Sequence, residues 1–361
     1  MNPNELRRMD LTLSEEHESI QDLFANFFAK QSPTTVARAA EPTGFDEGLW
    51  DQIVDLGVTR MAIPESAGGD GAGILELTLV AEELGRAIAP VPLIEHIVAT
   101  RLLAASGDSE LEDFLEEAAN GDRILGLALQ PLSGRQFVST AAVARDIVGF
   151  DGENLVIVTS SGARAHVGNQ ASLPFAWVDP GEESVRVVRS SGAERLYSTA
   201  QREWKTLTAA ALAGMTEASL AIAVKFVKTR ETMGVIVGTL QGISFPLADV
   251  SIGIEGARNL ARRAAWFLDN EPETEAGLQA AAIAYASGVA MRGTTTTAHA
   301  QGGLGFTVEA DASLYFLRAK GWALAGGSPL LDLKTVGELR ISAVTAANQS
   351  KERRESWISA L

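Results

Sequence analysis

Glycine-rich segments are the first places in this sequence where a phosphate group could be held, because glycine lets backbone N–H groups approach a ligand closely. The segment PESAGGDGAG (64–73) has the glycines but no Lys-Ser or Lys-Thr ending, so we interpret it as a connector. The segment QGGLG (301–305) is a second candidate, although glycine also serves ordinary interhelical turns. Glycine content alone leaves both interpretations of residues 301–305 open.

The charge balance limits which ligands and partners the chain can attract. Its 361 residues contain 30 Lys and Arg against 46 Asp and Glu, which gives a formal net charge of −16. Nucleic acid and anionic membrane would be repelled at long range, so we expect neither as a partner. An anionic ligand must therefore be held locally, by arginines and backbone N–H groups.

Residue types that are missing exclude further chemistry. The chain has no cysteine, which excludes disulfides, thiolate catalysis and Cys-ligated metals, and we expect no metal site. The first residues, MNPNELRRMD, lack the apolar core of a signal peptide, and no stretch approaches ~20 uninterrupted apolar residues. The sequence therefore predicts a cytoplasmic protein.

Hydrophobic periodicity predicts helices at both ends of the chain. Apolar residues recur at helical spacing from Ile20 to Phe28, and Thr12 or Ser14 can cap the start of that helix. Near the other end, a seam with steps of about three and four predicts a long bundle helix. Its members are Leu247, Val250, Ile254, Ala257, Ala261 and Leu268.

The middle of the chain has a different residue pattern, which is typical of β-strands. From about Arg123, short β-rich runs such as NLVIVTS and SVRVVRS are separated by Gly, Pro, Ser and Asp. We therefore expect an α+β fold with three domains. These are a helical domain at 1–122, a shortened β domain at 123–203 and a helical bundle at 204–361.

Three segments together resemble the acyl-CoA dehydrogenase family. LWDQIVDLGVTRMAIPESAGGDGAG, continued by LVAEELGRAIAPVP, resembles its N-terminal region. RETMGVIVGTLQGISFPLAD (230–249) matches R-x-x-F-G-x-x-[IL]-x-x-x-Q-x-x-x-x-x-L-A-D in spacing, with Met233 in place of Phe and Val237 in place of Ile or Leu. QGGLGFTVEADASLYFLRAK (301–320) resembles the glycine-rich segment. The resemblance covers nearly the whole chain and implies a helical N-terminal domain, a middle β domain and a C-terminal four-helix bundle.

The resemblance implies FAD as cofactor and an acyl-CoA thioester as substrate. In the family, residues of the second and third segments reach across a dimer interface to the adenosine diphosphate part of the neighbour's flavin. Carried over, they are Arg230, Thr232, Gln241, Gly302 and Gly303; His299 stands where the family usually has Gln, and Gln301 follows two residues later.

Most of these residues also have a simpler structural interpretation. Arg230 can be a surface arginine in a salt bridge at a helix end. Gln241 can cap the following helix, and His299 can be an interior histidine. Gly302 and Gly303 can form a plain turn.

The residues that the family uses around the flavin ring are missing. The middle domain of the family opens with T-E-P-x-x-G-S-D and continues with W-[IVF]-[ST]-N, whereas this chain reads GLALQPLSGRQFVST. The catalytic glutamate that usually precedes Gly-[ST] is replaced by Gly326 in FLRAKGWALAGGSP. In members that move the base to the first helix of the C-terminal domain, the matching position is Trp204. We therefore expect no catalytic residue in this chain.

These absences make the chain resemble the small subunit of a heteromeric α2β2 acyl-CoA dehydrogenase, in which a larger homologue supplies the base. Assemblies of this kind oxidise CoA thioesters of steroid side chains. One alternative is a self-sufficient flavoenzyme of the same fold with a relocated base, Glu203 or Glu217, although Glu203 can also be a solvated acid in the first turn of a helix. Another alternative is a scaffold that has lost cofactor use.

Overall fold

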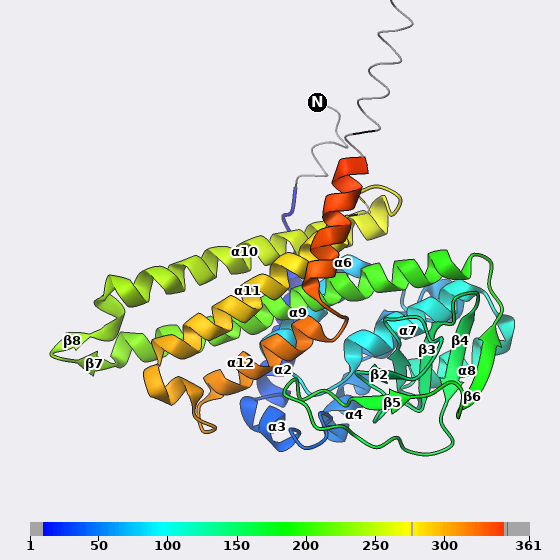
Figure 1. Cartoon of the computed structure of the whole chain (residues 1–361), viewed down its shortest axis with the longest axis horizontal. Coiled ribbons are helices and arrows are strands. Elements are labelled where there is room, and N and C mark those ends of the chain that lie inside the picture. The colour runs from blue at the N-terminus through cyan, green and yellow to red at the C-terminus, as the bar shows by residue number, and fades with distance from the viewer. Residues whose placement is uncertain (1–9, 276, 343–344, 346–361) are drawn as a thin grey trace, which may run out of the picture.

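The computed structural model describes residues 10–275, 277–342 and 345; the first nine residues, which entered the cytoplasmic prediction, and the end of the predicted third domain lie outside this range. The N-terminal region is helical (Figure 1). Its helices are α2 (Glu15–Gln31), α3 (Thr34–Ala39), α4 (Glu47–Asp55), α5 (Val58–Met61), α6 (Ile74–Arg86), α7 (Leu93–Ser106) and α8 (Glu112–Ala119), with short 3₁₀ turns at Glu65–Ala67 and Ser109–Leu111.

Side-chain caps fix where the first helices begin. The Ser14 side chain accepts a hydrogen bond from the backbone N–H of His17, so of the two predicted caps Ser14 starts α2. Asp46 caps α4 in the same way, accepting from the N–H of Leu49 at 2.8 Å. Phe24 and Phe28 of α2 are buried as the stripe predicts, whereas Leu23 is half exposed.

Small β-sheets follow the N-terminal helices. The larger sheet has the order β1-β3-β4-β6, with β1 and β3 parallel and the other pairs antiparallel. Strands β2 and β5 form a separate antiparallel pair in which Phe137 faces Trp177. The strands are β1 (Leu125–Leu127), β2 (Gln136–Val138), β3 (Asp146–Phe150), β4 (Leu155–Thr159), β5 (Ala176–Val178) and β6 (Ser184–Val188).

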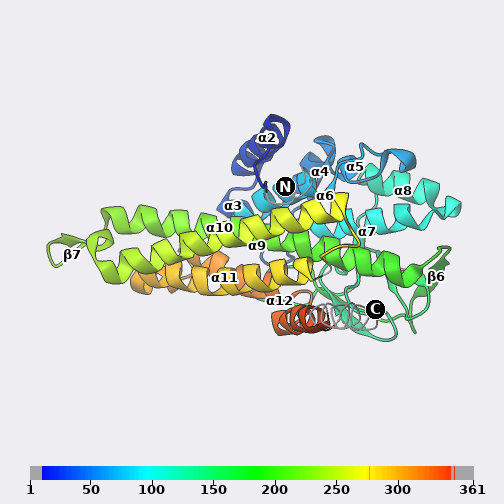
Figure 2. The same ribbon diagram turned by 90° about the horizontal axis from the view of Figure 1, so that it is seen from above.

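A bundle of long helices forms the rest of the described chain (Figures 1 and 2). The hairpin of β7 (Glu231–Thr232) and β8 (Val235–Ile236) projects from one end of the bundle, and the 3₁₀ turns Val237–Thr239 and Gly302–Phe306 lie near the same end. The bundle helices are α9 (Ala193–Thr229), α10 (Gln241–Asn270), α11 (Leu278–Ala300) and α12 (Asp311–Leu324), and a further helical stretch covers residues 329–342.

Helix α9 is the core element of this bundle. It is long and apolar enough to cross a membrane by composition, but 67% of its most apolar window is buried inside the protein, which is typical of a core helix. Two glycines let α6 and α9 pack very closely. A Cβ at Gly85 would lie 1.9 Å from the Ala211 carbonyl oxygen, and one at Gly214 would lie 1.9 Å from that of Glu82. Any larger residue at either position would push the helices apart.

The seam predicted for α10 is confirmed, because all six of its predicted members are buried. The start of α9 lies earlier than the periodicity after Trp204 suggested. Tyr197, Ala200 and Trp204 are all buried on one side of the helix, and this apolar contact extends α9 back to Ala193. As a result, Glu203 lies in the third turn of α9 and is buried, so the prediction of a solvated first-turn acid is wrong.

Candidate functional site

Arg230 lies at the end of α9, where the chain leaves the helix for the β7–β8 hairpin. Its backbone N–H donates to the Phe226 carbonyl at 2.9 Å, and its side chain is exposed. No ion pair joins it to a carboxylate in the part of the chain that the structure describes, so the salt-bridge interpretation is wrong there. Thr232 is also exposed, on β7 opposite Val235. Both side chains are accessible to a ligand or a neighbouring chain.

Gln241 is the first residue of α10 and is exposed. The residue that caps this helix is Leu240, which makes no side-chain capping bond, so the interpretation of Gln241 as the cap is wrong. A helix N-terminus presents backbone N–H groups and a partial positive charge, both of which favour an anion. Gln241 therefore stands beside a feature that suits a phosphate.

The third predicted segment lies at the end of α11. The His299 side chain is exposed, so it is not an interior histidine. The Gln301 side chain is buried and its Nε2 donates back to the Thr297 carbonyl at 3.3 Å. A Cβ at Gly302 or Gly303 would meet nothing within 4 Å, and Gly302 has φ +63°, so this exposed backbone is open to approach.

The two halves of the predicted cofactor site come from the same end of the bundle. A small apolar core joins the ends of α9 and α11 to the start of α10, and its buried members are Ala223, Val227, Leu247 and Ala300. The segments that carry the predicted residues, the connection from α9 through the β7–β8 hairpin to α10 and the turn after α11, lie at this end of the bundle (Figure 1). Contact between these residues and a cofactor stays a prediction.

A pocket of about 500 Å³ opens between the β2–β5 pair and α12. Its walls include residues of GLALQPLSGRQFVST, the segment that lacks the family's flavin-ring motif, and also Gly326, which replaces the family's glutamate. Among the described residues that line it, none is Asp or Glu, and Lys320 is the one charged side chain. A proton-abstracting carboxylate is therefore absent from the described lining of this pocket.

The two positions where the family places its base touch each other. A Cβ built at Gly326 would lie 2.4 Å from Cζ3 of Trp204 and 2.6 Å from its Cη2. The six-membered ring of Trp204 therefore fills the space that a side chain at position 326 would need. Trp204 is itself 4% exposed, so it cannot turn aside without disturbing the core.

Glu203, a candidate for a relocated base, is held away from the pocket. Arg101 of α7 donates to both of its carboxylate oxygens, at 3.1 and 3.2 Å, and donates further to the carbonyls of Ala62 and Ala72. Burial raises the pKa of Glu203, and the nearby Arg101 acts in the opposite direction. A carboxylate in such a bidentate pair is a structural tie between α7 and α9.

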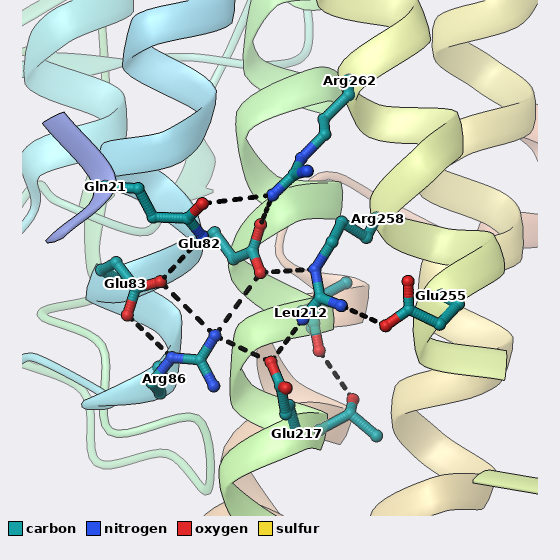
Figure 3. Close-up of polar contacts among 10 residues, drawn as sticks. Gln21, Glu82, Glu83, Arg86, Leu212, Glu217, Glu255, Arg258 and Arg262 are labelled. Carbon is teal, nitrogen blue, oxygen red and sulfur yellow. Dashed lines mark hydrogen bonds and ion pairs between the residues drawn. The ribbon is translucent and has the colours of Figure 1, made fainter. Parts of the chain in front are cut away.

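Glu217, the other candidate, belongs to a charge network that joins α2, α6, α9 and α10 (Figure 3). Its Oε2 pairs with Arg86 at 2.7 Å and with Arg258. Glu82, which is 1% exposed, receives Arg258 at 2.7 Å and Arg262 at 3.5 Å. We call this set the α6–α10 charge network; its members are Gln21, Glu82, Glu83, Arg86, Glu217, Glu255, Arg258 and Arg262. One carboxylate oxygen of Glu217 is thus paired with two arginines.

Two buried titratable residues of α7 were not predicted from the sequence. Ser139 and the Trp204 indole donate to Oε1 of Glu95 at 3.2 and 3.3 Å, and burial raises the pKa of this carboxyl. The next residue, His96, accepts from the Leu125 N–H at 3.1 Å, and burial lowers its pKa to about 4. Because α7 is apolar on nearly all sides, no amphipathic pattern marks either residue.

No cluster of three or more metal-ligating side chains occurs among the described residues.

Comparison with known proteins matches both helical regions to one family. Residues 14–122 match the N-terminal domain of acyl-CoA dehydrogenases, and residues 198–338 match their C-terminal domain. Acyl-CoA dehydrogenase FadE27 of Mycobacterium tuberculosis (strain ATCC 25618 / H37Rv) is 30% identical over 327 residues, which cover 81% of this chain and 88% of FadE27.

Solved structures agree with these matches. The Tcur3481–Tcur3483 steroid ACAD G363A variant superposes with a TM-score of 0.83 at 26% identity, covering 92% of this chain and all of the matched one. The ChsE4–ChsE5 complex from Mycobacterium tuberculosis gives a TM-score of 0.82 at 25% identity, covering 91% of this chain and 98% of the other. The fold, the motifs and these relatives together establish that the chain belongs to the acyl-CoA dehydrogenase family of oxidoreductases.

Proposed function

We propose that this chain is the subunit without a catalytic base in a heteromeric, FAD-dependent acyl-CoA dehydrogenase. A larger homologue, in an α2β2 assembly in the cytoplasm, supplies the carboxylate that removes the α-proton of the thioester. Bound FAD would supply the acceptor for the hydride that leaves the β-carbon. Relatives described as a steroid ACAD and as the ChsE4–ChsE5 complex support a CoA thioester of a steroid side chain as the substrate and a second subunit as the partner.

The observation that carries this proposal is the contact between Gly326 and Trp204. Both positions at which the family places its base are occupied by residues without a carboxylate, and the Trp204 ring fills the space between them. The relocated bases fit less well, because Glu203 and Glu217 are both tied to arginines. This chain therefore contributes cofactor binding and leaves proton abstraction to the partner.

The described residues fit the phosphate end of FAD. Arg230 is an exposed cation without a carboxylate partner in the described chain, the α10 N-terminus follows at Gln241, and the backbone at Gly302 and Gly303 is open. In this proposal Arg230, Thr232, Gln241 and His299 bind and orient the diphosphate part, together with the backbone of Gln301, Gly302 and Gly303.

Co-expression with a larger acyl-CoA dehydrogenase homologue tests the proposal. We expect a yellow complex that oxidises an acyl-CoA, and a colourless chain when it is purified alone. Arg230→Ala should lower the affinity of the complex for FAD by roughly 1.5–3 kcal/mol, since it removes a charge-assisted phosphate contact. Lys228→Ala, at another exposed basic residue two positions earlier, is the matched control and should leave FAD content unchanged.

Each alternative predicts a different result. A self-sufficient enzyme would turn over acyl-CoA as the lone chain and would lose that activity in Glu203→Gln or Glu217→Gln. A scaffold without cofactor use would show the same flavin content and the same complex activity with Arg230→Ala as without it.

A further inference from the structure

A separate cavity of about 710 Å³ lies between the N-terminal helices and the larger β-sheet. Its walls come from α4 and the loop before it, from the turn after α8, and from the residues around the start of β3. Its described lining shares no residue with the pocket between the β2–β5 pair and α12 or with the predicted cofactor residues. Small-molecule sites occur preferentially at such junctions between domains.

Three carboxylates of this cavity have no hydrogen bond or ion pair within the part of the chain that the structure describes. Glu47 and Asp51 lie four residues apart on α4, and Asp122 lies in the turn after α8. All three residues are exposed. Like charges at this spacing on a helix repel each other, so a bound cation would stabilise the α4 wall.

The β domain contributes a free positive charge to the same cavity. Arg145 directly precedes β3 and is exposed, and its guanidinium donates to the Ser160 carbonyl at 3.3 Å. It forms no ion pair with a described carboxylate, although three free carboxylates line the cavity with it. Opposite charges that share a cavity without reaching each other can be bridged by a ligand that carries both signs.

The other charged lining residues are already paired. Asp146 is buried, accepts from Oγ1 of Thr159 at 2.6 Å and pairs with Arg123 at 2.5 Å. Arg123 also pairs with Glu117. The charges that remain for a ligand are therefore three carboxylates and one guanidinium.

Apolar side chains complete the wall. Phe45, Ile124 and Val143 are half-buried lining residues that can cover the methylene stem of a ligand. Trp50 is buried, and its indole N–H donates to the Gly121 carbonyl at 3.3 Å, which holds α4 against the turn after α8. The cavity thus combines fixed apolar walls with free charges of both signs.

From these features we infer that the cavity binds a dibasic amino acid, a zwitterion with two cationic groups and one carboxylate on an aliphatic stem. The cationic groups pair with the free carboxylates of α4 and of the turn after α8. The carboxylate of the ligand pairs with Arg145, and its stem lies against the apolar wall. Such a ligand matches both signs of the free charges and the excess of carboxylates among them, which a simple cation or anion does not.

Calorimetric titration of the full chain with three matched ligands tests this inference. They are lysine, cadaverine, which lacks the carboxylate, and 6-aminohexanoate, which lacks the α-ammonium group. We expect lysine to bind roughly tenfold more tightly than either analogue, since each analogue loses one charge-assisted contact. General attraction to a chain with a net charge of −16 predicts the opposite order for cadaverine, which is more positive than lysine.

Variants that remove single charges assign the contacts. Arg145→Met should lower the affinity for lysine to that for cadaverine, without weakening cadaverine binding. Asp51→Asn should weaken the binding of lysine and of cadaverine, each by roughly tenfold. Asp55→Asn is the matched control, because Asp55 is an exposed acid on the same helix outside the cavity lining, and it should bind lysine as the wild type does.

A further variant fills the cavity without changing its charge. Thr43→Trp adds an indole at an exposed lining position, so the chain should fold, and it should abolish lysine binding.

Any of four results would overturn the inference: cadaverine binding as tightly as lysine, unchanged lysine affinity in Arg145→Met, equal weakening by Asp51→Asn and Asp55→Asn, or lysine binding that persists in Thr43→Trp. The readout is binding of an amino acid and not flavin content or dehydrogenation. A failure here therefore leaves the partner-subunit proposal standing, and the reverse also holds.

Discussion

Two neighbouring helices bury their acidic residues in opposite ways. On α6, Glu82 and Glu83 are 1% and 2% exposed and are surrounded by arginines of the α6–α10 charge network (Figure 3). On α7, Glu95 is 8% exposed and receives only neutral donors, from Ser139 and Trp204. The buried carboxylates of α6 are thus paired with arginines, whereas the buried carboxyl of Glu95 on α7 has only uncharged hydrogen-bond partners among the described residues.

The partners of the buried carboxylates differ because α6 and α7 face different parts of the molecule. Helix α6 packs against α9 and α10, where Arg258 and Arg262 extend from the polar side of α10. Helix α7 faces the region of Trp204 and the β sheets, where burial pushes Glu95 and His96 toward their neutral forms. The buried carboxylates of α6 therefore join helices through ion pairs, whereas Glu95 and His96 of α7 have uncharged hydrogen-bond partners.

The largest expected effect on stability comes from a change in the α6–α10 charge network. Arg258→Met leaves the buried Glu82 carboxylate without its shortest partner and removes a contact to Glu217. We expect a loss of about 3–5 kcal/mol in the free energy of unfolding, because the buried Glu82 would keep only the longer contacts to Arg86 and Arg262, both at 3.5 Å, and a poorly compensated buried charge is costly. Urea unfolding at neutral pH measures it.

The matched control is Arg263→Met on the same helix. Arg263 lies over the ring of Phe267, with 5.7 Å between guanidinium carbon and ring centroid, so its replacement should cost about 0.5–1 kcal/mol. If Arg258→Met cost no more than this control, the network would not stabilise the bundle.

The sequence predicted the helical framework well and the contacts between distant segments poorly. The six-residue seam of α10 follows from a repeating spacing, so its burial could be predicted residue by residue. The pairing of Glu82 with Arg258 joins residues far apart in the sequence, and no local pattern reveals it. For the same reason Glu203 looked like a solvated acid, although Arg101 binds it from another helix.

In the candidate site, too, some residues could be predicted from the sequence and others are revealed only by the folded structure. Arg230, Gln241 and the glycine pair have spacings that the family motif fixes, and the structure brings them to one end of the bundle. The packing of Trp204 on Gly326 requires two segments more than a hundred residues apart to meet, so only the folded chain reveals it. Glu95 carries no motif and lies on a helix without an amphipathic pattern.

The next prediction concerns His96 of α7 and the stability of the folded chain at low pH. Burial lowers the pKa of His96 to about 4 in the folded chain, against its ordinary value of 6.5 in the unfolded chain. Between these values the unfolded state binds a proton that the folded state does not, so this stability is present above pH 6.5 and is lost as the pH falls toward 4. The loss should be about 3 kcal/mol.

His96→Asn isolates this contribution, because the Asn oxygen can still accept from the Leu125 N–H. Urea unfolding of both proteins from pH 7 to pH 4 should show the wild type losing stability more steeply than the variant. Parallel pH curves would mean that burial does not lower the pKa of His96 in the folded chain, and the contrast between α6 and α7 would be weakened.

The smallest effect comes from Glu95→Gln, and its sign separates the two helices. The folded pKa of Glu95 is raised by burial, so above about pH 4.5 the unfolded chain gives up a proton that the folded chain keeps. Its contribution to stability is therefore full at low pH and is lost as the pH rises through the folded pKa. A neutral isostere avoids this cost, so Glu95→Gln should be as stable as the wild type at pH 7.5 or more stable by on the order of 1 kcal/mol.

Glu82→Gln, the same change in the charge network, should be destabilising at that pH, because it leaves Arg258 and Arg262 with less compensating charge. If both variants lost stability equally, Glu95 would be an ordinary paired carboxylate and the contrast between α6 and α7 would fail.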